Sequence, residues 1–338
     1  MGERQTIVIA GAGIGGLTAA LAVAAKGFPV ILCERARQLS EIGAGLQLSP
    51  NAGRVLAGLG LEEAVAAAAV EPEAIDIRAG ATGRLIASID LGAFRHRYGL
   101  PWRVIHRAQL QLVLARAVVA NPAIELRLGA TLAGFAAQAG GIVARVERFA
   151  GSDMIEGAAL IAADGVWSKT REAIGGAPAL PTGRVAWRAM IPAAAARLAP
   201  NRVGLWLGED AHLVHYPVAG GNQVNVVAIV EEDWHGEGWS EPGDPYRLSS
   251  RFGKWADEAR AIINTEVEWR RWAICAVDPA GPFVQDCVAL LGDAAHAMPP
   301  FLAQGAAMAI EDAAVIAHWL GAIAHIPTAL GAYRADRR

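Results

Sequence analysis

The stretch TIVIAGAGIGGLTAALAVAAKGFPVILCERA, residues 6–36, decides the fold class of this chain. Thr6–Ala10 is a short apolar run, and a tight cluster of glycines follows it. Leu17–Ala25 has the composition of a helix, Gly27 is suited to end that helix, and Pro29–Cys33 is a second apolar run. A strand, a glycine turn, a helix and a second strand within so few residues are typical of a parallel sheet covered by helices. The stretch therefore predicts an α/β fold of the Rossmann type.

The glycines of this turn follow the spacing GxGxxG within GAGIGG. Gly11 permits the sharp turn, Gly13 lets a pyrophosphate approach the backbone N–H groups at the start of the helix, and Gly16 lets the helix pack closely on the strand. Gly15 extends the same cluster. Glu34 ends the second strand, where a carboxylate can accept hydrogen bonds from both hydroxyls of an adenosine ribose. An acid there disfavours a 2′-phosphate, so the motif predicts FAD or NAD rather than NADP. The alternative is that the glycines serve packing alone.

The composition limits the class of protein. The chain has 338 residues, 54% of them hydrophobic, which suits a packed protein of roughly two domains. The net charge of -3 gives no basic field for nucleic acid. Cys33, Cys275 and Cys287 form no CxxC pair, and no apolar run reaches the ~18 residues of a membrane span. We therefore expect a cytoplasmic protein that binds neither nucleic acid nor membrane.

Two polar residues are expected beside a ligand because of where their elements begin or end. Arg107, in WRVIHRAQLQLVLARAV, lies near the start of an amphipathic helix and could bind a phosphate; the alternative is a solvated helix arginine. Asp164, in LIAADG, follows a buried strand, and a residue at that end of a parallel strand points into the ligand crevice. The alternative for Asp164 is a plain Asp-Gly turn.

The segment HLVHYPVAGGNQVNVVAIV, residues 212–230, predicts a β-hairpin that turns at Ala219–Asn222. Side chains alternate between the faces of a strand, so His212 and Tyr216 share one face and His215 points to the other. The two histidines are therefore poor partners for a shared metal ion, and we predict no metal site. His212 and Tyr216 could line a pocket, or they could form a half-buried structural pair.

Four motifs now stand in order along the chain: GAGIGG at 11–16, the acid Glu34, ADG at 163–165 and LGDAAHAMPP at 291–300. This ordered set resembles the group A flavin-dependent aromatic hydroxylases, the family of p-hydroxybenzoate hydroxylase and salicylate hydroxylase. The stretches GAGLQLSPNA and QGAAMAIEDA look like the branch with 3-hydroxybenzoate 6-hydroxylase and 6-hydroxynicotinate 3-monooxygenase. The resemblance covers nearly the whole chain.

The resemblance implies a bound FAD, with NADH or NADPH as a transient co-substrate. It assigns the pyrophosphate to the glycine turn, the ribose to Glu34, and the ribityl chain to Asp293 of Gly292-Asp293. Gly305 and Ala306, at the start of the last long helix, would direct N–H groups at the ring end that is negative when the flavin is reduced. The full set of predicted cofactor residues is Gly11, Gly13, Gly15, Gly16, Glu34, Arg35, Gln47, Arg107, Asp164, Gly292, Asp293, Pro299, Gly305 and Ala306.

The resemblance also implies an active site on the hairpin. The branch's pattern H-x-x-x-Y-P falls on His212, Tyr216 and Pro217, and its glutamine before the helix falls on Gln304. His212 would remove the proton of a ring hydroxyl, because an ordinary histidine pKa of ~6.5 suits a base at neutral pH. The activated ring would then attack a C4a-hydroperoxide of the flavin. The predicted substrate-pocket residues are Gln47, Arg188, His215 and Pro299.

The implied reaction is the hydroxylation of a small phenolic or hydroxy-heteroaromatic acid with NAD(P)H and O2. The alternatives are a related flavin monooxygenase that acts on a non-aromatic or larger ring, and a flavin-binding protein without catalysis. The family's usual glycine before Gln304 is Ala303 here, so we expect a slightly shifted loop.

The resemblance predicts an FAD-binding domain from residues 1–70, 100–180 and 276–338, with an inserted mixed β-sheet substrate domain from residues 71–99 and 181–275. The family's usual C-terminal helical extension is expected to be missing after residue 338. A homodimer is possible.

Overall fold

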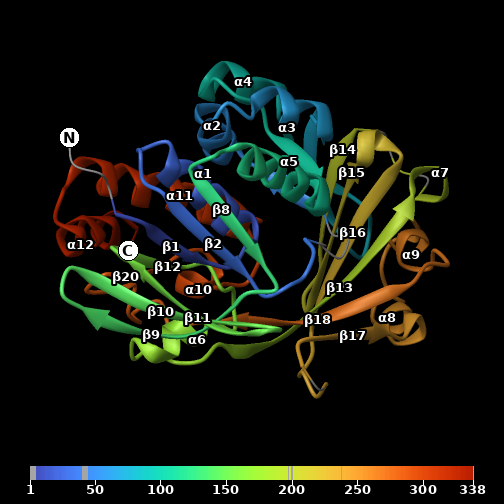
Figure 1. Cartoon of the computed structure of the whole chain (residues 1–338). Coiled ribbons are helices and arrows are strands. Elements are labelled where there is room, and N and C mark those ends of the chain that lie inside the picture. Colours follow the sequence, from blue (N-terminus) through green and yellow to red (C-terminus); the bar gives the residue numbers. More distant parts are fainter. Residues whose placement is uncertain (1–4, 40–44, 197, 199–200, 237, 338) are drawn as a thin grey trace.

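The computed structural model describes residues 5–39, 45–196, 198, 201–236 and 238–337. Two large sheets stand next to each other, one on each side of the molecule (Figure 1). The first sheet has the strand order β19-β20-β12-β1-β2-β8, and β20, β12, β1, β2 and β8 run parallel. This sheet confirms the predicted Rossmann-like α/β fold. Its strands are β1 (Ile7–Ala10), β2 (Val30–Glu34), β8 (Ile124–Leu128), β12 (Ala159–Ala162), β19 (Val284–Gln285) and β20 (Val288–Leu290).

Helices cover the first sheet on one side, and a small antiparallel sheet covers it on the other. The helix after the glycine turn begins at Ile14, three residues before the predicted start, because Gly13 is already its N-cap. One apolar core joins these layers. The elements are α1 (Ile14–Ala24), α5 (Arg107–Ala120), α11 (Gly305–Ala322), α12 (Ile326–Arg337), β9 (Thr131–Gln138), β10 (Gly141–Arg148), β11 (Gly151–Gly157), and the short helices α6 (Lys169–Ala173) and α10 (Asp293–His296).

The second sheet has eight strands in the order β17-β18-β13-β16-β15-β14-β5-β6, and its β14–β5 pair is parallel. It is therefore a mixed sheet, as predicted. Its strands are β5 (Ala74–Ala79), β6 (Leu85–Asp90), β13 (Leu180–Pro192), β14 (Arg202–Leu207), β15 (Ala211–Val218), β16 (Gln223–Glu231), β17 (Ser240–Gly243) and β18 (Trp269–Ala276). The strands come from the two segments that we assign to the substrate domain; the domain limits themselves stay a prediction.

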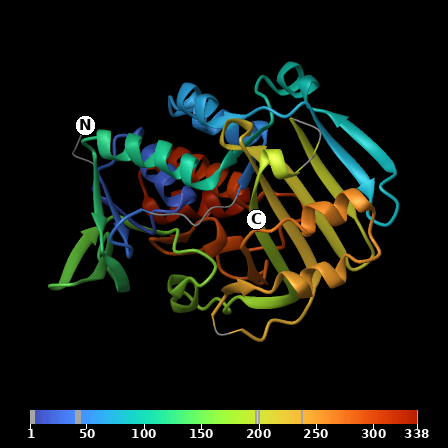
Figure 2. The same cartoon turned by 90° about the vertical axis from the view of Figure 1, so that its right-hand side faces the viewer.

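The two faces of the second sheet have different neighbours. On the outer face, α8 (Pro245–Arg251) and α9 (Asp257–Ile263) pack over Trp187, Leu213 and Trp269, and Figure 2 shows both helices lying across the strands. The inner face, which carries His212, Val214 and Tyr216, meets a three-stranded sheet in the order β3-β7-β4. The remaining elements are β3 (Gly45–Leu48), β4 (Ala69–Val70), β7 (Arg103–His106), α2 (Pro50–Gly58), α3 (Glu62–Ala68), α4 (Gly92–Tyr98), α7 (Ala193–Ala196) and η1 (Ala219–Gly221).

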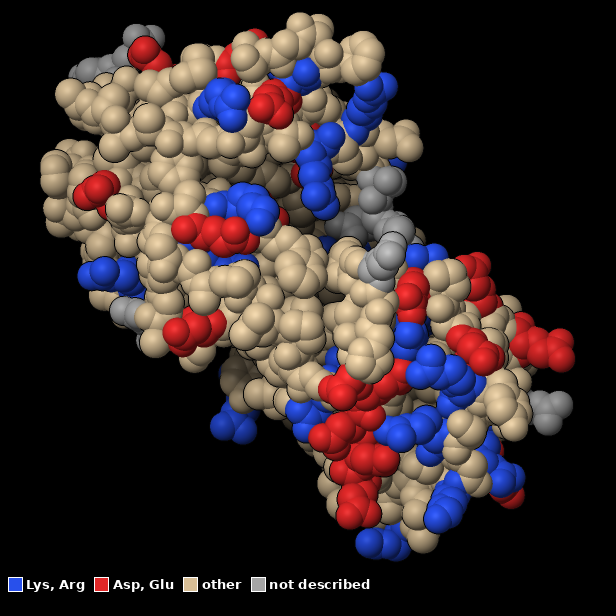
Figure 3. Space-filling view, turned by 90° about the horizontal axis from the view of Figure 1, so that it is seen from below, with Lys and Arg blue, Asp and Glu red and all other residues tan. Residues whose placement is uncertain are grey.

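Charged side chains of both signs lie next to one another on the lobe that carries α8 and α9 (Figure 3). Several of them form ion pairs there, among them Arg247–Glu232 at 2.6 Å and Arg260–Asp257 at 2.8 Å. None of the helices within the described residues has both the length and the apolar character needed to cross a membrane.

Candidate functional site

Four of the predicted cofactor motifs lie at one edge of the first sheet. Gly11 directly follows β1, Glu34 ends β2, Asp164 follows β12 by two residues, and Gly292 follows β20 by two residues. Because these strands are parallel neighbours, their carboxyl ends meet, and this is the edge where α/β sheets bind their ligands.

The glycines of the turn divide into those that pack and one that leaves space. A Cβ on Gly11 would lie 2.3 Å from the Ala163 carbonyl oxygen, and φ at Gly11 is +99°. A Cβ on Gly16 would lie 1.8 Å from the Gly11 carbonyl oxygen. A Cβ on Gly13 would meet no atom within 4 Å. The backbone at Gly13 is thus the place where a phosphate can come close.

Carboxylates beside this turn offer acceptors for sugar hydroxyls. Glu34 Oε2 accepts a hydrogen bond from the Ala12 N–H (2.7 Å), so the carboxylate lies against the glycine turn. Asp164 Oδ2 accepts from the Thr170 N–H and hydroxyl, while the buried Asp164 Oδ1 has no hydrogen-bond partner within the described residues. Asp293 is exposed at the first turn of α10, and Arg35 is exposed after Glu34. Carboxylate oxygens that can accept further hydrogen bonds suit a ligand that carries several hydroxyl groups.

Two helix N-termini, those of α1 and α11, carry no acidic residue of their own among the residues that the structure describes. Neither α1 nor α11 has an acidic residue in its first turn or a side-chain cap, and a Cβ on Gly305 would meet open space. Free N–H groups at a helix start favour negative charge. Arg107, which begins α5, adds a cation near the inner face. Together with the cradle at Gly13 and the unpaired Asp164 oxygen, these features fit FAD.

The loop before α11 is strained at the position where the sequence departs from the family's pattern. Ala303 has φ +52°, in the left-handed region that a glycine adopts without cost and an alanine does not. The alanine side chain is therefore strained at this position.

Asp312 organises the cofactor loop, and sequence reasoning assigned it no role. Asp312 is fully buried on α11, and its Oδ2 accepts from the Gly292 N–H (2.8 Å) and contacts His296 Nε2 (2.6 Å). Arg337 Nε donates to Asp312 Oδ1 at 2.6 Å. Burial acts to lower the pKa of His296, but the hydrogen bond to Asp312 and its charge raise it overall. These contacts indicate a structural role for His296.

His212 lies half-buried on the inner face beside the loop that leads to α11. Its ring centroid lies 5.8 Å from that of Phe301, and the Arg184 guanidinium lies 5.5 Å from the same Phe301 ring. These residues line a cavity of about 170 Å³ together with Ile229. Burial, and then the charge of Arg184, lowers the pKa of His212. The imidazole is therefore mainly neutral near pH 7 and can accept a proton.

Tyr216 and Arg188 lie deeper on the same face. Burial raises the pKa of Tyr216 far above its usual value, although the Arg188 charge acts in the opposite direction, so the phenol stays protonated. The Arg188 guanidinium lies 5.4 Å from the Trp272 ring, and its buried Nε has no hydrogen-bond partner within the described residues. Arg188 is thus a cation that has the capacity to bind an anion.

The three-stranded sheet closes onto this face through Gly45. Its N–H donates to Asn225 Oδ1 at 2.7 Å, and a Cβ on Gly45 would lie 2.4 Å from Tyr216 Cε2. Gln47, two residues further along β3, is half-buried and pairs with Val104 of β7. The β3 strand therefore joins the cofactor half of the molecule to the hairpin.

Gln304 and Pro299 flank Phe301 in sequence. Gln304 is the N-cap residue of α11, and its Oε1 lies 3.2 Å from Ser49 Oγ. Pro299 is half-buried between α10 and Phe301, and Ala306 lies in the first turn of α11. The structure thus brings Gln304 and Pro299 to the loop whose Phe301 touches His212.

The position of His215 corrects the prediction that it lines the substrate pocket. His215 is buried on the outer face, where a Cβ on Gly204 would lie 2.0 Å from its Nε2. Burial, followed by the charge of Arg78, lowers its pKa to about 4. Strand alternation puts His215 opposite His212 and Tyr216, so it packs against the sheet instead of the pocket.

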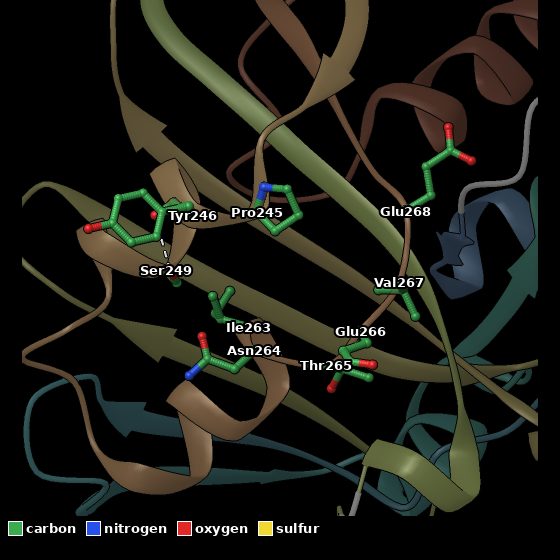
Figure 4. A pocket seen from close by; sticks show the side chains of 9 residues that line it. All are labelled: Pro245, Tyr246, Ser249, Ile263, Asn264, Thr265, Glu266, Val267 and Glu268. Carbon is green, nitrogen blue, oxygen red and sulfur yellow. Dashed lines mark hydrogen bonds between the residues drawn. The ribbon is translucent and has the colours of Figure 1, made fainter.

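A cavity of about 570 Å³ lies elsewhere, between α8 and the segment that follows α9 (Figure 4). Tyr246 and Ser249 line it from α8, and Asn264, Thr265 and Glu266 line it from the other side. It lies at the outer face, away from His212 and the cofactor edge. We therefore assign the candidate active site to the inner face.

Comparison with known proteins gives four informative similarities. Residues 4–338 match the family model described as FAD binding domain. The chain is 39% identical to 3-hydroxybenzoate 6-hydroxylase 1 of Aquipseudomonas alcaligenes, over 94% of this chain and 81% of that protein. It is 32% identical to 6-hydroxynicotinate 3-monooxygenase of Pseudomonas fluorescens, over 100% of this chain and 88% of that protein. The crystal structure of Klebsiella pneumoniae HpxO with FAD and uric acid superposes with a TM-score of 0.87 at 26% identity, over 98% of this chain and 84% of that one.

Proposed function

Because this chain belongs to the FAD binding domain family and is an FAD-dependent monooxygenase of the aromatic-acid hydroxylase type, we propose that it hydroxylates a small hydroxylated benzoic or pyridine acid. The co-substrates in this proposal are NAD(P)H and O2. When bound, FAD supplies the uptake of hydride and the activation of oxygen. Gly13, Glu34, Asp164 and Asp293 hold it at the edge of the first sheet, with Gly305 at its ring end.

His212 is the residue that moves the proton in this proposal. Its imidazole nitrogen accepts the proton of the ring hydroxyl, which makes the ring carbon a better nucleophile. The lowered pKa keeps this nitrogen free at neutral pH, and Arg184 helps the imidazole to release the proton again afterwards. The Phe301 ring packs against one side of the imidazole.

The neighbours of His212 bind and orient the substrate. Tyr216 remains a neutral phenol, which can donate one hydrogen bond to a phenolate oxygen. Arg188 is the proposed partner of the ring carboxylate, because its buried Nε has spare capacity and the inner face carries it on the same side as Tyr216. Gln47 and Gln304 add amide groups from the cofactor side, and Pro299 limits the space beside the ring.

The observation that carries the proposal is the half-buried His212 with a lowered pKa, beside the loop that leads to α11. The test is a screen of hydroxybenzoates and hydroxypyridine carboxylic acids for stimulated NAD(P)H oxidation, with ¹⁸O₂ and product analysis. Benzoate without a hydroxyl group is the matched control, because it cannot give up a ring proton. Incorporation of one ¹⁸O atom into the ring supports the proposal, whereas stimulated oxidation that yields only hydrogen peroxide for every acid refutes it.

A second candidate is hydroxylation of a different ring, which the likeness to HpxO bound to uric acid favours. Uric acid and its methylated forms belong in the same screen, and their product identifies this alternative. A flavin-binding protein without catalysis would show no substrate-dependent NAD(P)H oxidation at all. A cytoplasmic location and a homodimer remain part of the proposal, the latter to be measured by sedimentation of the FAD-loaded protein.

A further inference from the structure

A chain of hydrogen bonds begins at Glu311 of α11 and ends at Gln304. Asn51 Nδ2 donates to Glu311 Oε1 at 3.0 Å, and the Ser49 hydroxyl donates to Asn51 Oδ1. In the structure, Ser49 Oγ also lies 3.2 Å from Gln304 Oε1. Arg337 Nη2 lies 3.3 Å from Glu311 Oε2 and holds the acid as an ion pair. Hydrogen bonds thus connect α2, α11 and α12 to Gln304, the N-cap residue of α11.

The direction of every bond in this chain follows from its charged end. A carboxylate paired with arginine only accepts, so Asn51 must present its NH2 group to Glu311 and its oxygen to Ser49. The Ser49 hydroxyl has one proton, and it donates this proton in a hydrogen bond to Asn51 Oδ1. Ser49 Oγ then has only lone pairs for Gln304, and a glutamine amide can meet a lone pair only with its nitrogen.

Resting on the function proposed above, we propose that Glu311, Asn51 and Ser49 hold the Gln304 amide a half-turn away from its orientation in the structure, with Nε2 toward Ser49 and Oε1 toward the substrate. The two ends of a glutamine amide have nearly the same shape, so a half-turn exchanges them without moving the side chain. Gln304 then presents an acceptor to the pocket. The site selects a ring that carries a donor, such as O–H or N–H, over a ring of equal size without one. Ser49, Asn51 and Glu311 are positioning residues in this scheme.

The helix that begins at Pro50 supports this division of roles. Ser49 is the N-cap residue of α2, yet its side chain makes no capping hydrogen bond. Its hydroxyl is committed to Asn51 instead. Replacement of Ser49 therefore breaks the chain of hydrogen bonds between Asn51 and Gln304 without removing a helix cap.

The first test needs no substrate. In the FAD-loaded protein, Gln304→Glu puts a carboxylate against a serine oxygen that has no proton to give, so we expect Tm to fall by a few degrees. Asn51→Ala releases the Ser49 proton, so Gln304→Glu should cost clearly less in an Asn51→Ala background. Gln304→Met is the control, because it cannot hydrogen-bond in either background. Equal effects of Gln304→Glu in both backgrounds would overturn the proposed direction of the chain.

The second test measures the preference itself. Dissociation constants of 3-hydroxybenzoate and 3-fluorobenzoate are obtained from the change in flavin absorbance on titration. The hydroxyl compound should bind more tightly to the wild type, and Ser49→Ala should reduce this ratio by about fivefold, the worth of one hydrogen bond. Ser88→Ala removes a comparable hydroxyl on β6, bonded to Asp76, and should leave the ratio unchanged.

A reversed pair gives a rescue. Glu311→Gln alone loses the fixed direction, because two amides can pair either way, and the ratio should fall. When Asn51→Asp is combined with Glu311→Gln, the new glutamine donates to the new carboxylate, and that carboxylate again accepts the hydrogen bond of the Ser49 hydroxyl. The ratio of the two dissociation constants should therefore recover. An unchanged ratio in Ser49→Ala would overturn the inference. If the wild type binds neither acid, the proposed substrate class fails, and the melting experiment still decides the inference.

Discussion

Replacement of Gly45 by alanine should damage the junction between β3 and the hairpin. The new Cβ would lie 2.4 Å from Tyr216 Cε2 and 2.8 Å from the Asn225 side chain. Ordinary carbon contacts lie at about 3.5–4.0 Å, so the two sides must separate by roughly 1 Å. Tyr216 is only 4% exposed and has little room to turn, so β3 must move away and stretch its bond to Asn225.

The expected cost is about 1–3 kcal/mol for overpacking, with ~1 kcal/mol more for the weakened Gly45–Asn225 hydrogen bond. Alanine also makes the unfolded chain stiffer, which offsets ~0.4–1 kcal/mol and leaves a net loss of about 1–3.5 kcal/mol. Urea unfolding of the FAD-loaded protein measures this loss. The fraction of NAD(P)H oxidation that yields hydroxylated product should fall with it, because Tyr216 moves relative to the cofactor half.

Gly53→Ala is the matched control on α2. A Cβ there would lie 3.6 Å from Leu100 Cδ1, an ordinary contact, and alanine favours a helix over glycine by ~1 kcal/mol. This variant should be at least as stable as the wild type. If Gly45→Ala unfolds at the same urea concentration as Gly53→Ala and stays fully coupled, the packing argument for β3 is wrong.

Three further outcomes are expected. His212→Ala should retain FAD and lose coupled hydroxylation. In the wild type, kcat/KM should fall as the pH drops through the lowered pKa of His212, below 6.5, and Arg184→Gln should move this fall to higher pH. A pH profile of kcat/KM that is unchanged in Arg184→Gln would contradict the role of the Arg184 charge. Glu34→Ala should weaken FAD by ~1.5–3 kcal/mol for each charge-assisted hydrogen bond lost, measured as the FAD dissociation constant, and an unchanged constant argues against the ribose role. Ala303→Gly should stabilise the protein by ~1 kcal/mol, because the left-handed backbone no longer strains a side chain, and a lower melting temperature would contradict this.

Local patterns predicted the elements that depend on neighbours in sequence. The glycine turn and the hairpin at Ala219–Asn222 both appear where the turn residues indicate them. The shared face of His212 and Tyr216 follows from alternation alone. These features depend on backbone sterics and periodicity, which the sequence contains directly.

Contacts between distant segments could not be predicted in the same way. Asp312 lies within a helical pattern and could have been a solvent-facing acid; only the fold brings Gly292, His296 and Arg337 to its carboxylate. The approach of Gly45 to Tyr216 likewise joins segments that no local pattern relates. The family's pattern marked Ala303 as a departure from glycine, but its left-handed backbone is visible only in the structure.

The parallel pairing of β14 with β5 has a consequence for biosynthesis. Arg202 of β14 pairs with Ala74 of β5, so β5 leaves the ribosome about 130 residues before its neighbour β14. At ~5–20 residues per second, this strand waits roughly 6–26 s for its neighbour. Among the described strands, its earlier partner is β6, whose Leu85, Ile86 and Ile89 are exposed even in the finished protein. During synthesis this two-stranded ribbon therefore lacks one neighbour until β14 is made, and slow translation before residue 202 should lower the yield of folded protein.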